Sequence, residues 1–154
     1  MRGLTDQSLI KNQNVWPQEQ DFQHLTSSEL KEVQLARISY YKVGSILSMQ
    51  FHLSNGISSP FAGKSGVNKC ESSVDLLAAG RPIRKIRIKA SKNWVNEIRF
   101  CDENDFMVGE VKADSGVGDW YDISLEKGER IIGFQEEHDG ENYVRRFGFV
   151  TFKP

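Results

Sequence analysis

The stretch KNWVNEIRF at residues 92–100 decides the fold, because it has a counterpart on either side. One counterpart lies 49 residues earlier, in SILSMQF at 45–51, and the other 49 residues later, in YVRRFGF at 143–149. The apolar positions form two columns: Met49, Ile98 and Phe147, and then Phe51, Phe100 and Phe149. A period that recurs twice predicts three copies of one supersecondary unit.

Composition indicates a globular protein. The chain has 154 residues, of which 38% are hydrophobic and 27% charged, enough for one domain with a core. A net charge of −1 gives no global field that would attract nucleic acid or an anionic membrane. The apolar runs are too short to span a bilayer and residues 1–10 lack a signal core, so we expect no membrane insertion and a cytoplasmic location.

Strand patterns fill the chain after Val33, where no helix-period segment of ten or more residues occurs. Around Ile86 and Ile88, apolar residues alternate with the cations Lys85, Arg87 and Lys89, as in a half-buried strand. We therefore predict an all-β domain of three four-stranded antiparallel units that share one axis. WYDISL at 120–125 matches VDLL at 74–77, and we expect it to open the third unit.

The first 30 residues are polar and lack a sustained period, so we expect an N-terminal extension, a loosely ordered arm, ahead of a domain at 31–154. Trp16 and Phe22 are its isolated apolar residues. They would fill pockets either on this domain or on a partner. Thr26 could cap a short helical turn that follows it.

Three segments resemble the jacalin-like lectins: ILSMQFHLSNGISSPFAG at 46–63, IRKIRI at 83–88, and GERIIGF with YVRRFGFVTFKP within 128–154. The last is similar to the closing pattern of that family, and the resemblance covers about 33–154. It implies a β-prism, in which three Greek-key sheets surround a pseudo-threefold axis.

The same resemblance implies a sugar site at one end of the prism, built from a G-x-x-x-D loop and a glycine-rich N-terminal loop. Here Arg145 occupies the aspartate position and Glu141 the glycine position, and Gly140 is one residue out of register. Arginine has only donors and cannot replace a carboxylate acceptor. We therefore expect a degenerate sugar pocket, although this altered loop stays a candidate ligand site through Gly140, Asn142, Tyr143 and Arg145.

A second candidate lies one repeat earlier. A step of 49 residues back from Arg145 reaches Asn96, and a further step reaches Leu47, which cannot bind sugar hydroxyls. Asn96 offers an acceptor and two donors, and Trp94 could stack on a pyranose ring, with Asn93 beside them. The alternative is an ordinary hairpin loop with Trp94 partly packed on its neighbour.

Other motifs give no catalytic or cofactor site, so we expect a non-enzyme without cofactor or metal. Residues 136–139 are acidic and predict a polar apical turn. Cys70 and Cys101 have no histidine nearby in the sequence that would activate a thiolate. The basic run with Lys85, Arg87 and Lys89 predicts a solvated strand face, or a patch for an acidic partner or a sulfated glycan.

Two functions remain from these patterns. The first is a non-enzymatic protein-interaction or assembly module on a lectin-like β-prism. It would bind through the apical loops, the basic strand face or the Trp16 and Phe22 arm. The alternative is a carbohydrate-binding lectin that uses its apical loops. The expected partner is a protein or a glycan, and the chain could form oligomers.

Overall fold

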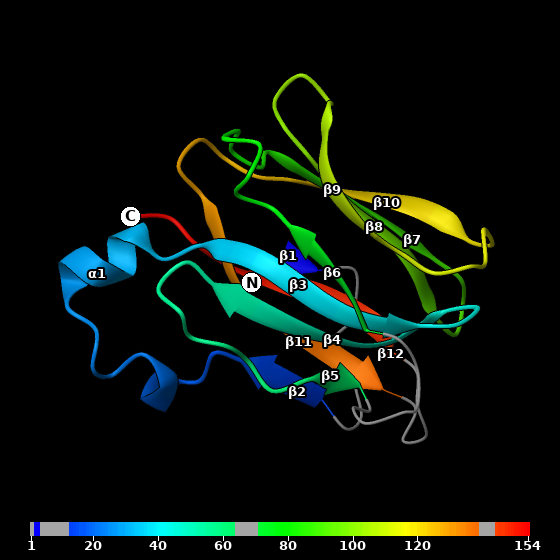
Figure 1. Ribbon diagram of the computed structural model, residues 1–154, viewed down its shortest axis with the longest axis horizontal. Coiled ribbons are helices and arrows are strands. Elements are labelled where there is room, and N and C mark those ends of the chain that lie inside the picture. Colours follow the sequence, from blue (N-terminus) through cyan, green and yellow to red (C-terminus); the bar gives the residue numbers. More distant parts are fainter. Residues whose placement is uncertain (1, 4–12, 64–70, 139–143) are drawn as a thin grey trace.

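The computed structural model describes residues 2–3, 13–63, 71–138 and 144–154, which form three four-stranded antiparallel sheets (Figure 1). The strand order of the first sheet is β5 (Ala62–Gly63), β4 (Ile46–Leu53), β3 (Leu35–Lys42), β6 (Glu71–Asp75). The order of the second is β10 (Asp119–Ser124), β7 (Lys85–Ala90), β8 (Val95–Cys101), β9 (Met107–Lys112). That of the third is β1 (Arg2–Gly3), β12 (Val144–Phe152), β11 (Arg130–His138), β2 (Gln13–Trp16).

Each sheet is built on one central hairpin, formed by β3 and β4, β7 and β8, or β11 and β12. In the first two sheets the next strand extends this hairpin on one side. A fourth strand then returns to the other side, which is a Greek-key connection. In the third sheet the N-terminal strands β1 and β2 take those two outer places. The expected all-β prism of three four-stranded sheets is confirmed.

The two columns of the 49-residue repeat lie in the shared core. All six side chains are at most 1% exposed: Met49, Ile98, Phe147, Phe51, Phe100 and Phe149. The ring of Phe149 contacts that of Phe100 edge-on, with centroids 5.9 Å apart. The repeat is thus a repeat of core positions, one set from each sheet.

Two short helical segments precede the first sheet, namely η2 (Glu19–Asp21) and α1 (Ser27–Glu32). The Thr26 side chain caps α1 by accepting a hydrogen bond from the Glu29 backbone N–H at 3.1 Å. Within the part of the chain that is described, no helix combines the length and apolar character needed to cross a membrane.

The N-terminal segment differs from the loosely ordered arm that we expected. Strand β2 pairs with β11, from Trp16 opposite Phe134 to Gln13 opposite Glu137. Trp16 is 5% exposed and stacks on Phe134, with centroids 6.2 Å apart. Burial of this indole outweighs the polar character of its neighbours. Residues 13–16 are therefore a strand of the domain, whereas most of residues 1–12 lie outside the described part.

Strand β10 differs from the prediction as well. Residues 120–125 were expected to open the third unit, but β10 pairs with β7 along its full length, from Asp119 opposite Ala90 to Ser124 opposite Lys85. Similarly, β6, which includes Val74 and Asp75 of VDLL, pairs with β3. The strands β6 and β10 are therefore the equivalent closing strands of the first and second sheets. The predicted match between the two segments is consistent with this equivalence, but the expectation that residues 120–125 open the third unit is wrong.

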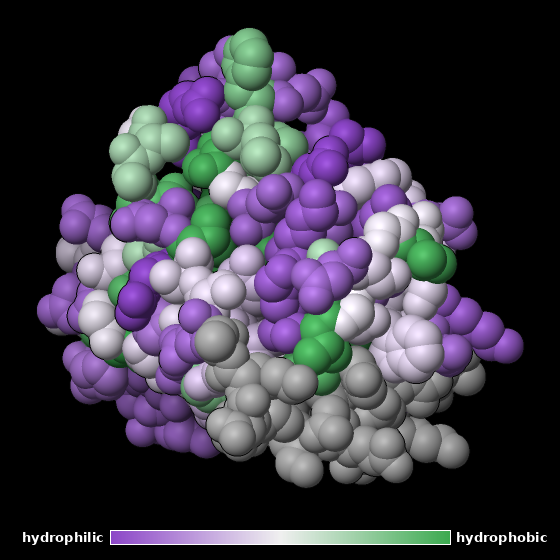
Figure 2. All heavy atoms as spheres, turned by 45° about the vertical axis from the view of Figure 1, so that its right-hand side comes forward, coloured by the Kyte–Doolittle hydropathy of each residue, from purple (hydrophilic) through white to green (hydrophobic). Residues whose placement is uncertain are grey.

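The surface is mainly polar, as Figure 2 shows for one face. Apolar residues form a few separate groups. One of them lies at the top of the view, at the loop that connects β8 to β9. Phe106, at the end of this loop, is 63% exposed, and Met107, which begins β9, is 49% exposed.

Candidate functional site

Strands β3, β7 and β11 end at the same end of the prism, where β4, β8 and β12 begin (Figure 1). A hollow of about 470 Å³ lies there, between the tips of the first and second hairpins. It is lined by Gly44, Ser45, Ser91, Lys92, Asn93, Trp94, Asn96, Ser115 and Val117. We call it the apical hollow. It contains all three candidate residues of the second repeat.

Asn96 reaches this hollow because of a β-bulge. Lys89 pairs with Glu97 and Ala90 pairs with Val95, which leaves Asn96 as the extra residue of β8. A bulge redirects the extra side chain and ends regular pairing. The first hairpin has the same irregularity at Leu47 and the third has it at Arg145. The three positions that are 49 residues apart are therefore three equivalent bulges.

The side chain of Asn96 is 1% exposed and only partly satisfied. Its Nδ2 donates to the carbonyl oxygen of Val117 at 2.6 Å. Its Oδ1 is buried and has no hydrogen-bond partner among the described residues. A buried amide oxygen without a donor costs free energy, and a ligand hydroxyl would remove that cost once the side chain is uncovered.

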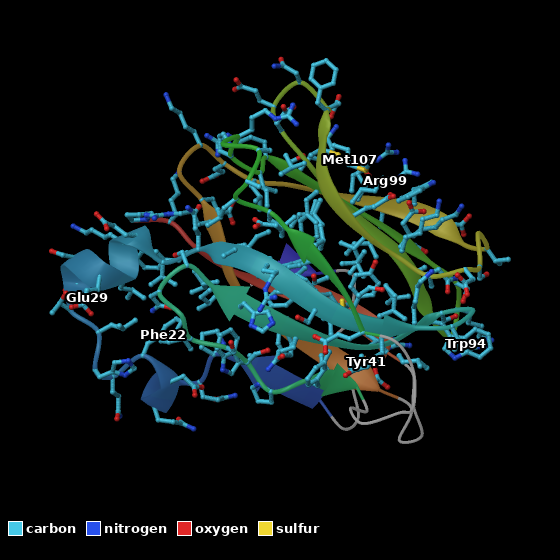
Figure 3. The ribbon with its side chains drawn as sticks, viewed as in Figure 1. Phe22, Glu29, Tyr41, Trp94, Arg99 and Met107 are labelled. Carbon is cyan, nitrogen blue, oxygen red and sulfur yellow. The ribbon has the colours of Figure 1, made fainter. Side chains whose placement is uncertain are left out.

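The hairpin tip at Ser91 holds Trp94 at the edge of the apical hollow. The backbone N–H of Ser91 donates to the Trp94 carbonyl oxygen at 2.9 Å. The Ser91 hydroxyl accepts hydrogen bonds from the backbone N–H groups of Asn93 and Trp94, at 3.4 and 3.2 Å. The Trp94 side chain is 40% exposed at the far end of the prism (Figure 3). Part of its apolar surface is thus open to a flat ligand.

A loop between β9 and β10 forms the opposite wall. The backbone N–H of Asp114 donates to the Val43 carbonyl oxygen at 2.9 Å, and that of Ser115 donates to Gly44 at 2.8 Å. The Asp114 carboxylate also pairs with Lys42 at 2.8 Å, and this hydrogen bond raises the pKa of Lys42. These contacts join the first and second hairpin tips.

A glycine allows this wall to approach the second sheet. Gly118 has φ of +130°, and a Cβ there would lie 2.7 Å from the Ala90 carbonyl carbon. A side chain at this position would separate the loop from β7.

The third-repeat candidates cannot be assigned to the apical hollow from the described residues. Gly140, Asn142 and Tyr143 are outside the described residues, and of Arg145 the structure describes only the backbone within β12. Whether the third-repeat pocket is degenerate therefore stays a prediction.

The basic side chains of β7 point outward from the sheet: Lys85, Arg87 and Lys89. They form ion pairs with carboxylates and cation–π contacts with an aromatic ring. Lys85 pairs with Asp105 at 2.7 Å and Arg87 with Asp122 at 3.1 Å. Arg87, Lys89 and Arg99 also lie over the Trp120 ring, 4.6–5.4 Å from its centroid. Trp120, at the centre of this face, was not predicted to lie there, because residues 120–125 were expected to join the next unit.

Trp16 and Phe22 contact each other, with ring centroids 6.2 Å apart. Trp16 fills a pocket of this domain, and Phe22 is only half-buried against the core. Of the two alternatives for Trp16, a pocket on this domain or one on a partner, the structure shows the first.

The acidic segment also differs from expectation. Residues 136–138 continue β11 rather than form an apical turn, and Glu136 and Glu137 are 1% and 5% exposed. Pairing with β12 explains this burial, since Glu137 lies opposite Arg146. Cys101 ends β8 and is buried, which raises the pKa of its thiol, whereas Cys70 lies outside the described residues.

Comparison with known proteins identifies the fold. No protein-family model and no curated protein sequence matches the chain. Solved structures do. A prostate-specific WGA16 glycoprotein lectin matches with a TM-score of 0.60 at 15% identity, over 79% of this chain and 83% of that chain. The fold is the β-prism of the jacalin-like lectins.

Two further β-prism lectins match to a similar degree. Artocarpin, solved with methyl-α-mannose, has a TM-score of 0.58 at 13% identity, over 77% of this chain and 83% of its own. The Calystegia sepium agglutinin has a TM-score of 0.58 at 14% identity, over 79% and 84%. At such identities the likeness establishes the fold, while ligand binding depends on the residues of this chain.

Proposed function

We propose that this β-prism is a lectin that binds a neutral carbohydrate in the apical hollow. The observation that carries the proposal is Asn96, whose buried Oδ1 lacks a donor although it lines an open hollow beside Trp94. A sugar hydroxyl could donate to Oδ1, and the exposed face of Trp94 could cover the apolar face of the ring.

The remaining lining supports a neutral ligand. Ser45, Ser91 and Ser115 offer hydroxyl groups that donate and accept, and Asn93 adds an amide. Lys92 is the only charged residue among those that line the hollow. The sugar-binding aspartate of the jacalin-like lectins offers two carboxylate oxygens, whereas Asn96 offers one amide oxygen. We therefore expect weak binding by one site, with Kd of about 1 mM.

The neighbouring structures favour this function over the protein-interaction module that we first expected. Those reported above are lectins, and one was solved with methyl-α-mannose, which makes this sugar the first probe. The described residues include no observation that would favour an assembly role instead. Binding rather than catalysis fits a site made of amides, hydroxyls and an indole.

Ligand-observed NMR with a panel of neutral sugars, which detects affinities near about 1 mM, tests the proposal. Asn96→Leu is the sharpest variant, because the first hairpin already carries Leu47 at the equivalent bulge, where it is 3% exposed. We expect binding to a defined sugar class that is lost in Asn96→Leu and in Trp94→Ala. Trp120→Ala, on the outer face of the second sheet, is the matched control and should bind as the unaltered protein does.

Each other outcome has a distinct meaning. Sugar binding that survives both apical variants would move the site to another hairpin tip and contradict the proposal. A folded protein that binds no glycan would favour the protein-interaction module.

A further inference from the structure

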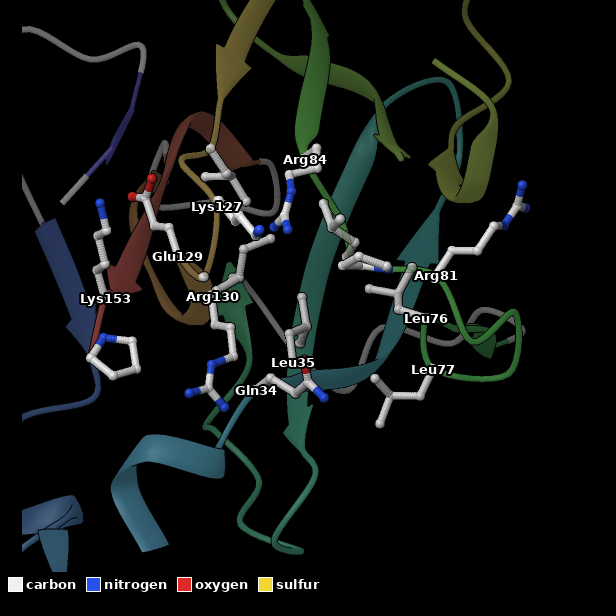
Figure 4. A pocket seen from close by; sticks show the side chains of 16 residues that line it. Gln34, Leu35, Leu76, Leu77, Arg81, Arg84, Lys127, Glu129, Arg130 and Lys153 are labelled. Carbon is white, nitrogen blue, oxygen red and sulfur yellow. The ribbon is translucent and has the colours of Figure 1, made fainter. Parts of the chain in front are cut away.

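A second hollow, of about 370 Å³, lies at the opposite end of the prism, where β3, β7 and β11 begin (Figure 4). We call it the basal hollow. Its lining includes four apolar side chains that are at most 7% exposed: Leu35, Leu76, Leu125 and Ile131. Its volume is at the lower end of the range for small-molecule sites, about 300–1,000 Å³.

The charges around the basal hollow are unbalanced. Five cationic side chains line it, namely Arg81, Arg84, Lys127, Arg130 and Lys153, against the one carboxylate side chain of Glu129 among the described lining residues. The whole chain has a net charge of −1, so this excess is local.

Two of these cations and the carboxylate already have partners. Arg81 pairs with Asp102 at 3.1 Å, and Lys153 pairs with Glu126 at 2.6 Å. Glu129 accepts hydrogen bonds from the backbone N–H of Glu126 and from the Thr151 hydroxyl.

The other three cations, Arg84, Lys127 and Arg130, have no carboxylate partner among the described residues. They come from two segments, 81–84 and 125–131, and lie close together on one side of the hollow in Figure 4. Like charges gathered at a low-dielectric surface repel one another, and an anion placed among them would relieve this repulsion.

The backbone holds these three cations in position. Leu125 donates to the Arg84 carbonyl oxygen at 2.8 Å, which joins the segment before β7 to the end of β10. Arg130 opens β11 opposite Phe152. Between them, the turn with Lys127 is closed by a bond from Glu129 to the Glu126 carbonyl oxygen at 3.0 Å. Such preorganisation lowers the entropic cost of binding.

We propose that the basal hollow binds a small amphipathic anion. Arg84, Lys127 and Arg130 would hold its carboxylate, sulfate or phosphate group. Its apolar body would cover Leu77, which is 40% exposed, and the half-buried Ile83, above the buried leucines. Guanidinium groups suit these anions because they donate two parallel hydrogen bonds. This site is independent of the apical hollow, at the other end of the strands.

Calorimetric titration with naphthalene-2-sulfonate tests the inference. We expect saturable binding that weakens with salt and is at least about tenfold weaker in Lys127→Gln/Arg130→Gln. Arg37→Gln/Lys112→Gln removes the same charges from exposed positions outside the hollow and should leave binding unchanged. Thermal unfolding of both double variants checks that each is folded.

The choice of probes separates the two parts of the site. Inorganic sulfate should bind more weakly than naphthalene-2-sulfonate because it lacks an apolar body. Neutral 2-naphthol should also bind more weakly, because it lacks the anionic group. The order of affinity among the sulfonate, 2-naphthoate and 2-naphthyl phosphate then identifies the preferred anionic group. Absence of saturable naphthalenesulfonate binding, equal binding to the Lys127→Gln/Arg130→Gln variant, or equal affinity for inorganic sulfate would overturn the inference.

Discussion

The rings of Phe51 and Phe149 stack in the core with centroids 6.1 Å apart and planes at 26°. They are equivalent residues of the first and third repeats, and both side chains are 0% exposed. This contact joins two sheets that share no strand-to-strand hydrogen bonds. Side-chain packing along the shared axis therefore has to hold the prism together.

Loss of one such ring should destabilise the whole domain. We expect Phe149→Ala to lower the free energy of unfolding by about 3–5 kcal/mol, because it removes buried apolar area and leaves a cavity. Phe106→Ala, at a ring that is 63% exposed, is the control and should change it by less than about 0.5 kcal/mol. Urea denaturation of both variants measures the difference, and similar values would show that the axis is not the main support.

Close packing of the N-terminal strand depends on Gly133. A Cβ at this position would overlap the carbonyl oxygen of Trp16 and the Pro17 ring. We expect Gly133→Ala to displace β2 and to lower the free energy of unfolding by about 3 kcal/mol. Gly116→Ala is the control, because a Cβ there would meet no atom within 4 Å.

Amide hydrogen exchange gives a second test of the same contact. Exchange at the β2 amides that bond to β11 should accelerate in Gly133→Ala and stay slow in Gly116→Ala. Unchanged exchange in the first variant would mean that β2 tolerates a side chain at position 133.

His52 should make stability depend on pH. Its ring nitrogens lie 2.8 Å from the hydroxyls of Ser39 and Ser58. Burial, aided by the nearby Arg37, lowers the pKa of His52 below 6.5. Because the unfolded chain binds the proton more readily, stability should fall as the pH falls below about 6.5, until the folded-state pKa is passed.

The urea midpoint at pH 7.5 and at pH 5 measures this dependence. His52→Gln should reduce the difference between the two midpoints, whereas His24→Gln, at an exposed ring, should leave it unchanged. An equal pH dependence in the His52 variant would assign the effect to other groups.

The sequence predicts much of the fold because its repeat marks core positions. Met49, Ile98 and Phe147 can be aligned without a structure, since each central hairpin must supply the same apolar side chains to a common axis. The same alignment finds Asn96. That all three aligned positions are bulges was not predictable, because a bulge depends on how two strands pair.

Strand partners and cavities depend on contacts that no local pattern records. The pattern of residues 120–125 indicates a strand but does not say which neighbour it joins. Trp16 lies in a polar context, yet it is buried because β11 has a free edge beside it. The basal hollow combines cations from three separate segments, so its charge excess appears only in the folded chain.

The measurement that tests the central proposal most directly is a titration of the ¹⁵N-labelled protein with methyl-α-mannose, followed by amide chemical shifts. We predict saturable shifts at residues 91–96 and 115–117 and at Gly44 and Ser45, all of which should disappear in Asn96→Leu. Shifts confined to another part of the chain, or none at sugar concentrations well above about 1 mM, would contradict a lectin site in the apical hollow.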